Sequence, residues 1–166
     1  MSVSLSPAAS LRRFGFLLAF IVVVADQASK WWILDVLMNP VPRVVEVTSF
    51  FNLVLVWNPG VSFGMFQHDA EIMPYLLSAL AFAVAAMVSG WLWKAERWTQ
   101  AAAVGLVIGG ALGNIVDRLR FGAVCDFLDF HIAGWHFWAF NIADAGISVG
   151  VALLLIDGLF FDRETS

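Results

Sequence analysis

Four aspartates, Asp26, Asp117, Asp126 and Asp144, lie within or beside long apolar runs of this 166-residue chain. Ionisable side chains in such positions are costly in a membrane and are kept for a structural or chemical reason. Two carboxylates that lie close together cannot both ionise readily, so one of them keeps a proton. Such a pair can hydrolyse a peptide bond, because one carboxylate takes a proton from water while the other protonates the scissile carbonyl.

Asp126 and Asp144 fit this chemistry better than the other two aspartates. No Lys or Arg lies close to Asp144 in the sequence, and a buried carboxylate without a cationic partner is expensive. The apolar neighbours of Asp126 predict a raised pKa. In a continuous helix Asp126 would lie half a turn out of phase with Asp117, whereas a break near Gly122 would free it to meet Asp144.

The other two aspartates favour structural ion pairs. Asp117 is followed by Arg118, with Arg120 nearby, and an ion pair is the favoured interpretation. Asp26 and Lys30 are spaced i, i+4 on one helix face, which suits a direct pair that neutralises both groups near the membrane.

Two asparagines repeat one spacing, because Asn114 precedes Asp117 by three residues and Asn141 precedes Asp144 by three. That spacing places both side chains on one helix face. Each Asn can donate to a neighbouring carboxylate or to a bound peptide carbonyl; the alternative is that these groups only pair helices by hydrogen bonds.

Other chemistries find less support. His131 and His136 are spaced i, i+5, which is not a metal-binding pair on a helix face, and we expect no metal site. The serines do not lie in a Gly-x-Ser-x-Gly elbow. Cys125 has no His near it in the sequence, so we interpret it as a small buried residue.

The composition indicates that these residues belong to a membrane protein. Hydrophobic residues make up 61% of the chain and charged residues 13%, whereas a soluble domain carries about twice that charged fraction. The formal net charge is -4 and no basic cluster occurs, which argues against a nucleic-acid partner.

The hydropathy pattern predicts a mainly α, polytopic single domain over residues 1–166, with an interfacial section that contains some β structure. Residues 1–11 are interpreted as a loose tail. The β-branched and aromatic residues from Val44 to Trp57 predict short strands, and the Gly-x-x-x-Gly spacing in the third span predicts close helix packing. Four spans are expected at about 13–34, 72–93, 98–117 and 140–161, with irregular sections at about 35–71 and 118–139.

The positive charges favour one orientation of these spans. Four spans place both termini on one side, and that side holds five of the nine Lys and Arg residues, so the positive-inside rule favours cytoplasmic termini. The two longer sections then face the periplasm, and all four aspartates gather at that face. A cleaved signal peptide at the first span is the alternative, but no convincing cleavage site follows it.

Five sequence blocks resemble the motifs of lipoprotein signal peptidase, also called signal peptidase II, and they occur in the family's order. Two positions depart mildly from the family's motifs: Ser62 stands where Ala is more usual, and Cys125 stands where Val is common. The blocks are DQASK at 26–30, NPGVSFG at 58–64, GNIVDR at 113–118, GAVCDF at 122–127 and FNIAD at 140–144.

The resemblance implies an aspartic endopeptidase of the bacterial inner membrane that cuts diacylglyceryl-modified prolipoproteins just before the lipidated cysteine. It implies Asp126 and Asp144 as the catalytic pair, a β cradle over about 44–64, no metal or organic cofactor, contact with membrane lipids, and inhibition by globomycin. We expect a monomer, because nothing in the sequence demands an oligomer. The supporting or substrate-binding residues it implies are Asp26, Lys30, Asn58, Gly60, Asn114, Asp117, Arg118 and Asn141.

Three alternatives remain open at this stage. Membrane carboxylates also carry protons or cations in transport proteins, although four short spans without an evident inverted repeat leave little room for alternating access. A non-catalytic membrane scaffold, or an intramembrane aspartic protease of another family, would also be compatible with the residues.

Overall fold

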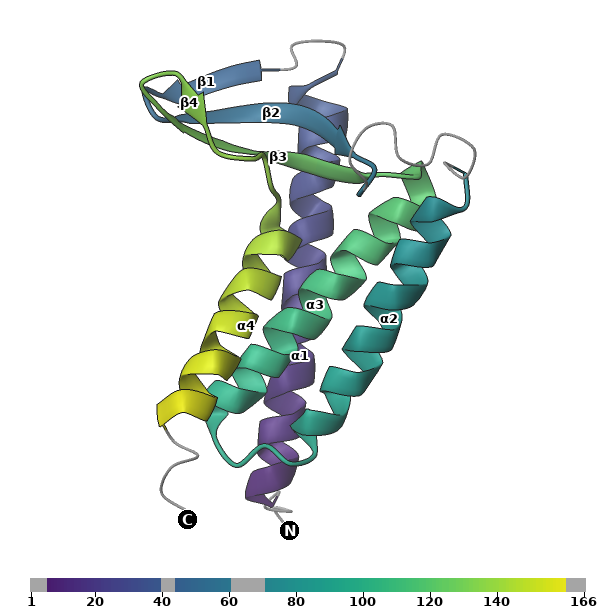
Figure 1. Cartoon of the computed structure of the whole chain (residues 1–166), viewed down its shortest axis with the longest axis vertical. Coiled ribbons are helices and arrows are strands. Elements are labelled where there is room, and N and C mark those ends of the chain that lie inside the picture. Colours follow the sequence, from purple (N-terminus) through teal and green to yellow (C-terminus); the bar gives the residue numbers. More distant parts are fainter. Residues whose placement is uncertain (1–5, 40–43, 61–70, 161–166) are drawn as a thin grey trace.

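The computed structural model describes residues 6–39, 44–60 and 71–160 of the chain. Four long helices run side by side, and a small sheet lies across one end of them, opposite the end where α1 begins and α4 finishes (Figure 1). In chain order the elements are α1 (Pro7–Trp31), the π-helical continuation η1 (Trp32–Leu37), β1 (Val44–Thr48), β2 (Phe51–Asn58), α2 (Met73–Leu92), α3 (Trp98–Phe121), β3 (Val124–Ile132), β4 (Trp135–His136) and α4 (Ile142–Phe160).

All four helices are long and apolar enough to cross a membrane, with mean hydropathies between 1.5 and 1.9. At 1.5 Å per residue, about 20 residues match the thickness of a bilayer core. The predicted mainly α fold with four spans and a small sheet is confirmed, and the chain is a multi-pass membrane protein.

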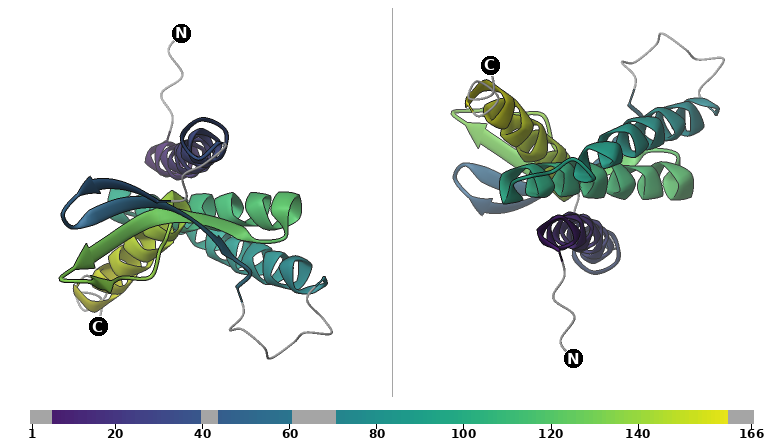
Figure 2. Two further views of the ribbon diagram at one scale, coloured as in Figure 1. Left: turned by 90° about the horizontal axis from the view of Figure 1, so that it is seen from above. Right: turned by 90° about the horizontal axis from the view of Figure 1, so that it is seen from below.

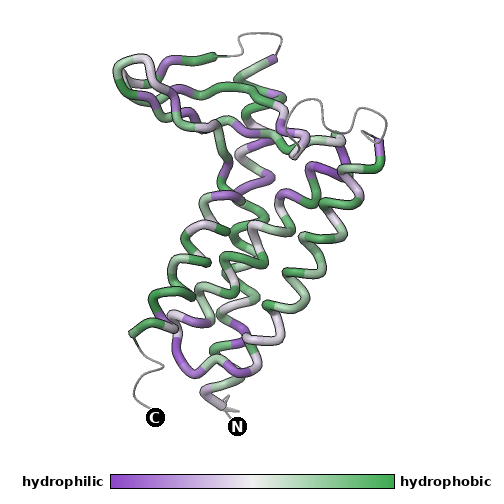
Figure 3. The backbone as a smooth tube through the Cα atoms, viewed as in Figure 1, coloured by the Kyte–Doolittle hydropathy of each residue, from purple (hydrophilic) through white to green (hydrophobic). Residues whose placement is uncertain are grey.

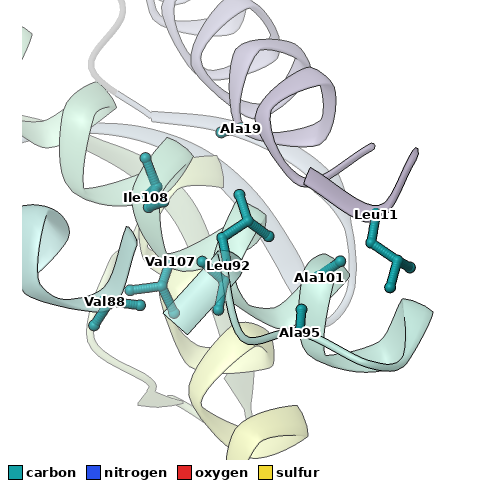
Figure 4. Packing of buried hydrophobic residues seen from close by; sticks show 9 residues of the cluster. Leu11, Ala19, Val88, Leu92, Ala95, Ala101, Val107 and Ile108 are labelled. Carbon is teal, nitrogen blue, oxygen red and sulfur yellow. The ribbon is translucent and has the colours of Figure 1, made fainter. Parts of the chain in front are cut away.

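The third helix, α3, is the centre of the bundle. Of its most apolar window 67% is buried, against 22% for each of the other three helices, whose outer faces are left for lipid. In the end-on views, α1 lies on one side of α3, while α2 and α4 diverge on the other side (Figure 2). A buried apolar cluster that includes Leu92, Ala101 and Val107 joins α1, α2 and α3 away from the sheet (Figure 4).

Glycines on α3 allow this close packing. A Cβ added at Gly109 would lie 2.6 Å from the backbone oxygen of Ala19 on α1, which no real side chain tolerates. Gly105 likewise faces the backbone of Gly15, and Gly110 faces that of Ala143 on α4. The predicted role of the Gly-x-x-x-Gly spacing is therefore confirmed, because both neighbouring helices approach α3 where it lacks a side chain.

The sheet is antiparallel, with the strand order β1-β2-β3-β4. Val56 on β2 pairs with Asp126 on β3, and Asn52 pairs with Asp129, with an irregularity of register between Leu53 and Val56. Part of the sheet packs on η1 through a second apolar cluster, which contains Ile33, Met38, Cys125 and Phe127. This cluster fixes the position of the first half of β3 relative to the helices.

Some predicted boundaries were wrong, for local reasons. Residues 1–11 are not all a loose tail, because Ser6 caps a helix that begins at Pro7. The first helical segment extends to Leu37 rather than to residue 34. The section 118–139 is not irregular throughout, since α3 continues to Phe121 and β3 and β4 occupy most of the rest. Residues 61–64, which belong both to the predicted cradle and to the NPGVSFG block, lie outside the described residues.

Candidate active site

Gly122 brings Asp126 to the site. It has φ +73°, in the left-handed region that glycine adopts without strain, and its N–H donates to the Arg118 carbonyl at 3.0 Å. The helix therefore ends at Phe121, and the chain turns into β3 two residues before Asp126. The predicted helix break near Gly122 is confirmed.

Asn141 and Asp144 form the N-terminal cap of α4. The Asp144 N–H donates to Asn141 Oδ1 at 2.9 Å, and the Asn141 N–H donates to Asp144 Oδ2 at 3.3 Å. This reciprocal arrangement is a capping box. The expectation that both residues share a helix face was wrong here, because α4 begins only at Ile142; the same spacing has a different cause.

Two asparagine amides connect Asp126 to Asp144. Asn141 Nδ2 donates two hydrogen bonds, to Asp126 Oδ1 at 2.7 Å and to Asn114 Oδ1 at 3.2 Å. Asn114 Nδ2 in turn donates to Asp144 Oδ1 at 2.7 Å. The predicted donation from each Asn to a carboxylate is thus found, and the two amides hold the two carboxylates facing one small region.

Asn58 approaches Asp126 from β2. Its Nδ2 donates to Asp126 Oδ2 at 3.0 Å, while its Oδ1 accepts from the Gly60 N–H at 2.9 Å. Gly60 has φ +81°, so a glycine suits this tight turn. Arg118 lies beside the same turn, since its Nη2 is 3.8 Å from where a Cβ on Gly60 would be.

The two carboxylates differ in their surroundings. Asp126 is 2% exposed, whereas Asp144 is partly exposed. Burial raises the pKa of Asp126 to about 6, and the nearby charge of Asp144 adds to this, although hydrogen bonds from Asn58 and Asn141 oppose it. The predicted direction of the shift is confirmed.

Lys30 is the centre of a second polar network, which lies next to Asp126 and Asp144. Its Nζ lies 2.8 Å from a carboxylate oxygen of Asp26 and 2.8 Å from one of Asp117, and all three side chains are buried. Asp26 accepts from the Ala143 N–H at 3.0 Å, and Asp117 accepts from the Cys125 N–H at 3.0 Å. The two acids therefore hold the backbone immediately before Asp144 and Asp126.

The prediction for Asp26 and Lys30 is confirmed, whereas the partner expected for Asp117 was wrong. Asp117 pairs with Lys30 and not with Arg118 or Arg120. Successive residues of a helix point in different directions, so Arg118 is badly placed to reach its neighbour.

Gln27 belongs to the site but was not singled out from the sequence. Its Nε2 donates to Asp117 Oδ1 at 2.9 Å, to the Gly113 carbonyl at 3.2 Å and to Asp26 Oδ2 at 3.1 Å. A polar amide next to Asp26 in an apolar span was the available signal, because such a group needs partners.

Cys125 is fully buried, and burial raises the pKa of its thiol to about 12. The interpretation of Cys125 as a small packing residue is confirmed.

Among the residues that the structure describes, no three His, Cys, Asp or Glu side chains are grouped so as to bind a metal ion. Along the backbone, hydrophilic positions gather where the helices meet the sheet and again at the opposite end, with apolar stretches between (Figure 3).

Comparisons with known proteins agree with this arrangement. The family described as Signal peptidase (SPase) II matches residues 18–160. The lipoprotein signal peptidase of Rhodopseudomonas palustris is 46% identical over 153 residues, which cover 89% of this chain and 92% of that protein. The enzyme of the same name from Beijerinckia indica is 42% identical over 148 residues, 89% of each chain. A solved bacterial membrane enzyme superposes with a TM-score of 0.74 at 29% identity, over 92% of this chain and 91% of its own.

Proposed function

The chain belongs to the signal peptidase II family, and from this we propose that it is an aspartic endopeptidase that removes signal peptides from diacylglyceryl-modified bacterial prolipoproteins. Cleavage falls just before the lipidated cysteine. The observation that carries the proposal is the Asp126–Asp144 pair, which the amides of Asn114 and Asn141 join at one end of a membrane-spanning bundle. None of the comparisons supports the transport alternative.

The proposed reaction assigns opposite roles to the two carboxylates. Asp144, which is partly exposed, takes a proton from a water molecule, and the water oxygen attacks the scissile carbonyl carbon. Asp126, whose raised pKa favours the protonated form, gives its proton to the carbonyl oxygen. As the tetrahedral intermediate collapses, Asp144 gives its proton to the leaving amine of the cysteine and Asp126 takes one from a hydroxyl of the intermediate. The peptide bond breaks, and both carboxyl groups return to their starting protonation states.

The surrounding residues position this pair. Asn114 and Asn141 orient the carboxyl groups, and Asp26, Lys30 and Asp117 hold the backbone that carries them. Asn58, Gly60 and Arg118 lie on the β2 side of Asp126 and supply polar groups for an extended substrate backbone. Preorganised groups of this kind lower the cost of orienting reactants.

We further propose the inner membrane as the location, with both termini cytoplasmic and the sheet at the periplasmic surface. This placement brings the pair to the depth at which a lipidated cysteine would lie. The enzyme acts as a monomer without a metal or organic cofactor, in contact with membrane lipids, and a globomycin-type cyclic peptide inhibits it.

The test is a cleavage assay with purified full-length enzyme in detergent. A diacylglyceryl-modified prolipoprotein and its unmodified form are compared, with wild type beside Asp126→Asn and Asp144→Asn. Each variant should lose a factor of at least about 100 in kcat, the usual contribution of a general acid or base. Asp157→Asn, which alters a buried carboxylate at the opposite end of the bundle, is the matched control and should retain activity.

Cleavage of the lipidated substrate alone, together with two folded but inactive variants, supports the proposal. If Asp126→Asn stays active while Asp117→Asn is folded and inactive, the catalytic pair has been assigned wrongly. If wild type cuts neither substrate, the proposed activity is refuted.

A further inference from the structure

A cavity of about 510 Å³ lies on the sheet, beside the catalytic pair. Its walls are apolar and include Val54, Val56 and Phe137, and Trp138 at its rim is 87% exposed. Val56 is also the residue that pairs with Asp126 across the β2–β3 ladder. The cavity therefore begins next to the proposed acid and extends along the sheet away from it.

The other end of the cavity is polar, and three side chains form it. Asp129 accepts from His136 Nδ1 at 2.9 Å and from Asn52 Nδ2 at 3.1 Å. The His136 ring stacks on His131 with ring centroids 4.9 Å apart, which fixes its orientation. We name Asn52, Asp129 and His136 the polar floor.

Two side chains of the polar floor, Asn52 and Asp129, can accept further hydrogen bonds. Asn52 is buried, and among the described residues its Oδ1 has no hydrogen-bond partner. Burial raises the pKa of Asp129, but the hydrogen bonds from His136 and Asn52 outweigh it and leave the pKa lowered, so the carboxylate is ionised. An ionised carboxylate accepts about four hydrogen bonds, and the three contacts from its two described partners leave capacity for a donor from a ligand.

The distance between Asp126 and Asp129 along β3 indicates which substrate residue would reach the polar floor. Asp129 lies three residues beyond Asp126 on β3, which at about 3.3 Å per residue is roughly 10 Å, or three residues of extended peptide. The sheet lies at one end of the helices (Figure 1). In the proposed function, the apolar signal peptide stays among the spans, and the part of the substrate after the cleavage point leaves the membrane on the side of the sheet.

We propose that this cavity is a subsite for the mature segment of the substrate, and that its polar floor selects a hydrogen-bond-donating side chain at about the third residue, counting the lipidated cysteine as the first. The inference rests on the proposed function and extends it. The apolar walls hold the stem of that side chain, and Asp129 accepts from its hydroxyl, amide or ammonium group. An aspartate at that position is repelled by Asp129, and a leucine leaves the floor's acceptors without a partner.

The experiment uses full-length enzyme and diacylglyceryl-modified prolipoproteins that differ only at mature residue three, which is Lys, Ser, Leu or Asp. Parallel sets vary residues two and four. For wild type, kcat/KM should be at least about tenfold higher with Lys or Ser than with Leu, the equivalent of one hydrogen bond to a charged group. In Asp129→Asn and in His136→Gln this preference should shrink to about twofold, because kcat/KM for the Lys and Ser substrates falls.

His136→Gln alters a side chain that is half exposed, so it keeps the measurement informative if Asp129→Asn folds poorly. Glu96→Gln removes an exposed charge in the loop before α3 and should keep the wild-type preference. An equal response of wild type to all four residues at every tested position overturns the subsite while leaving the proposed function intact. A preference that persists in both floor variants does the same. If wild type cuts none of the lipidated substrates, the proposed function fails, and the subsite fails with it.

Discussion

Asp126 and Asp144 have the same side chain but different access to water. Asp126 comes from a buried strand, and Asn58 and Asn141 cover its two oxygens. Asp144 begins a helix and is partly exposed. Because the amides of Asn114 and Asn141 link them, the position of one carboxyl group constrains the other, while burial raises the pKa of Asp126.

The titration of Asp126 should appear in the pH dependence of stability. Its folded-state pKa is raised from 3.8 to about 6, so its contribution to stability is complete below pH 3.8 and is lost as the pH rises through about 6. Asp126→Asn removes this loss. Between about pH 4 and pH 7 the variant should therefore gain up to about 3 kcal/mol relative to wild type.

Thermal unfolding of both proteins in detergent, followed by tryptophan fluorescence across that pH range, measures the difference. Asp157→Asn, in which Asp126 is intact, provides the comparison. A difference between Asp126→Asn and wild type that stays constant across the range would contradict the assigned pKa.

Lys30 neutralises two buried carboxylates at once. In Lys30→Met the acids Asp26 and Asp117 lose their shared cation while staying buried, which should cost about 3–5 kcal/mol of stability. Lys94→Met, at an exposed lysine, should change stability by less than about 0.5 kcal/mol. Thermal unfolding of the three proteins decides the matter, and equal melting temperatures for both variants would show that Lys30 does not carry this role.

At the scale of elements, α3 positions the site by contacting each of the other helices. Its glycines let α1 and α4 approach closely, and this proximity lets Asp26 on α1 reach the Ala143 N–H on α4. Gly122 then ends α3 and directs β3 across the top of the bundle. The spacing of the proposed catalytic pair thus depends on helix packing as well as on the local turns.

Gly109→Ala should test this packing. The added methyl would lie 2.6 Å from the Ala19 carbonyl oxygen, so α1 and α3 must separate, and overpacking of this kind costs about 1–3 kcal/mol. Activity should fall with stability, because the separation also displaces Asp26. Gly90→Ala on α2 is the matched control: nothing lies within 4 Å of its added Cβ, and stability should be unchanged or slightly higher.

Stability is measured by thermal unfolding, and activity as kcat/KM for the lipidated substrate. If Gly109→Ala behaved like Gly90→Ala in both measurements, close contact between α1 and α3 would not matter for the site.

The whole molecule has a polar network at each end and apolar surface between. One network surrounds the proposed catalytic pair, Asp126 and Asp144, beneath the sheet. At the other end, Arg97 forms two hydrogen bonds to Asp157, at 2.7 and 3.0 Å, and Gln100 adds a third at 2.6 Å. These bonds tie the start of α3 to the end of α4, so both ends of the helix pair are fixed while the lipid-facing surface stays apolar.

This polarity allows the proposed orientation to be tested with single cysteines. Cys125 is fully buried and its thiol pKa is raised to about 12, so it should not react with a maleimide. Trp138→Cys, at the exposed rim of the sheet, should be labelled by an impermeant maleimide on intact spheroplasts. Lys94→Cys, in the short loop between α2 and α3, should be labelled only after the membrane is opened. The reverse pattern would place the sheet in the cytoplasm.

Much of this protein follows from its sequence alone. Apolar runs of about 20 residues have few alternatives to membrane-spanning helices, because backbone groups in lipid must be paired within the segment. The sequence also indicates the chemistry, because Asp144 has no cation nearby in the sequence, Asp126 lies among apolar residues, and Gly122 favours a break in the helix. All of these signals are local in the sequence, since each depends on one contiguous segment of at most about 20 residues.

The tertiary structure decided which distant groups meet. Asp117 pairs with Lys30, which is 87 positions earlier in the chain, and not with the arginine beside it, because neighbouring residues diverge around a helix. The equal spacings of Asn114 to Asp117 and of Asn141 to Asp144 serve a mid-helix network in one case and a helix cap in the other. The cavity floored by Asn52, Asp129 and His136 needs strands that are far apart in sequence to pair. Such pairings depend on the packing of the whole chain, so residue types and local spacing do not determine them.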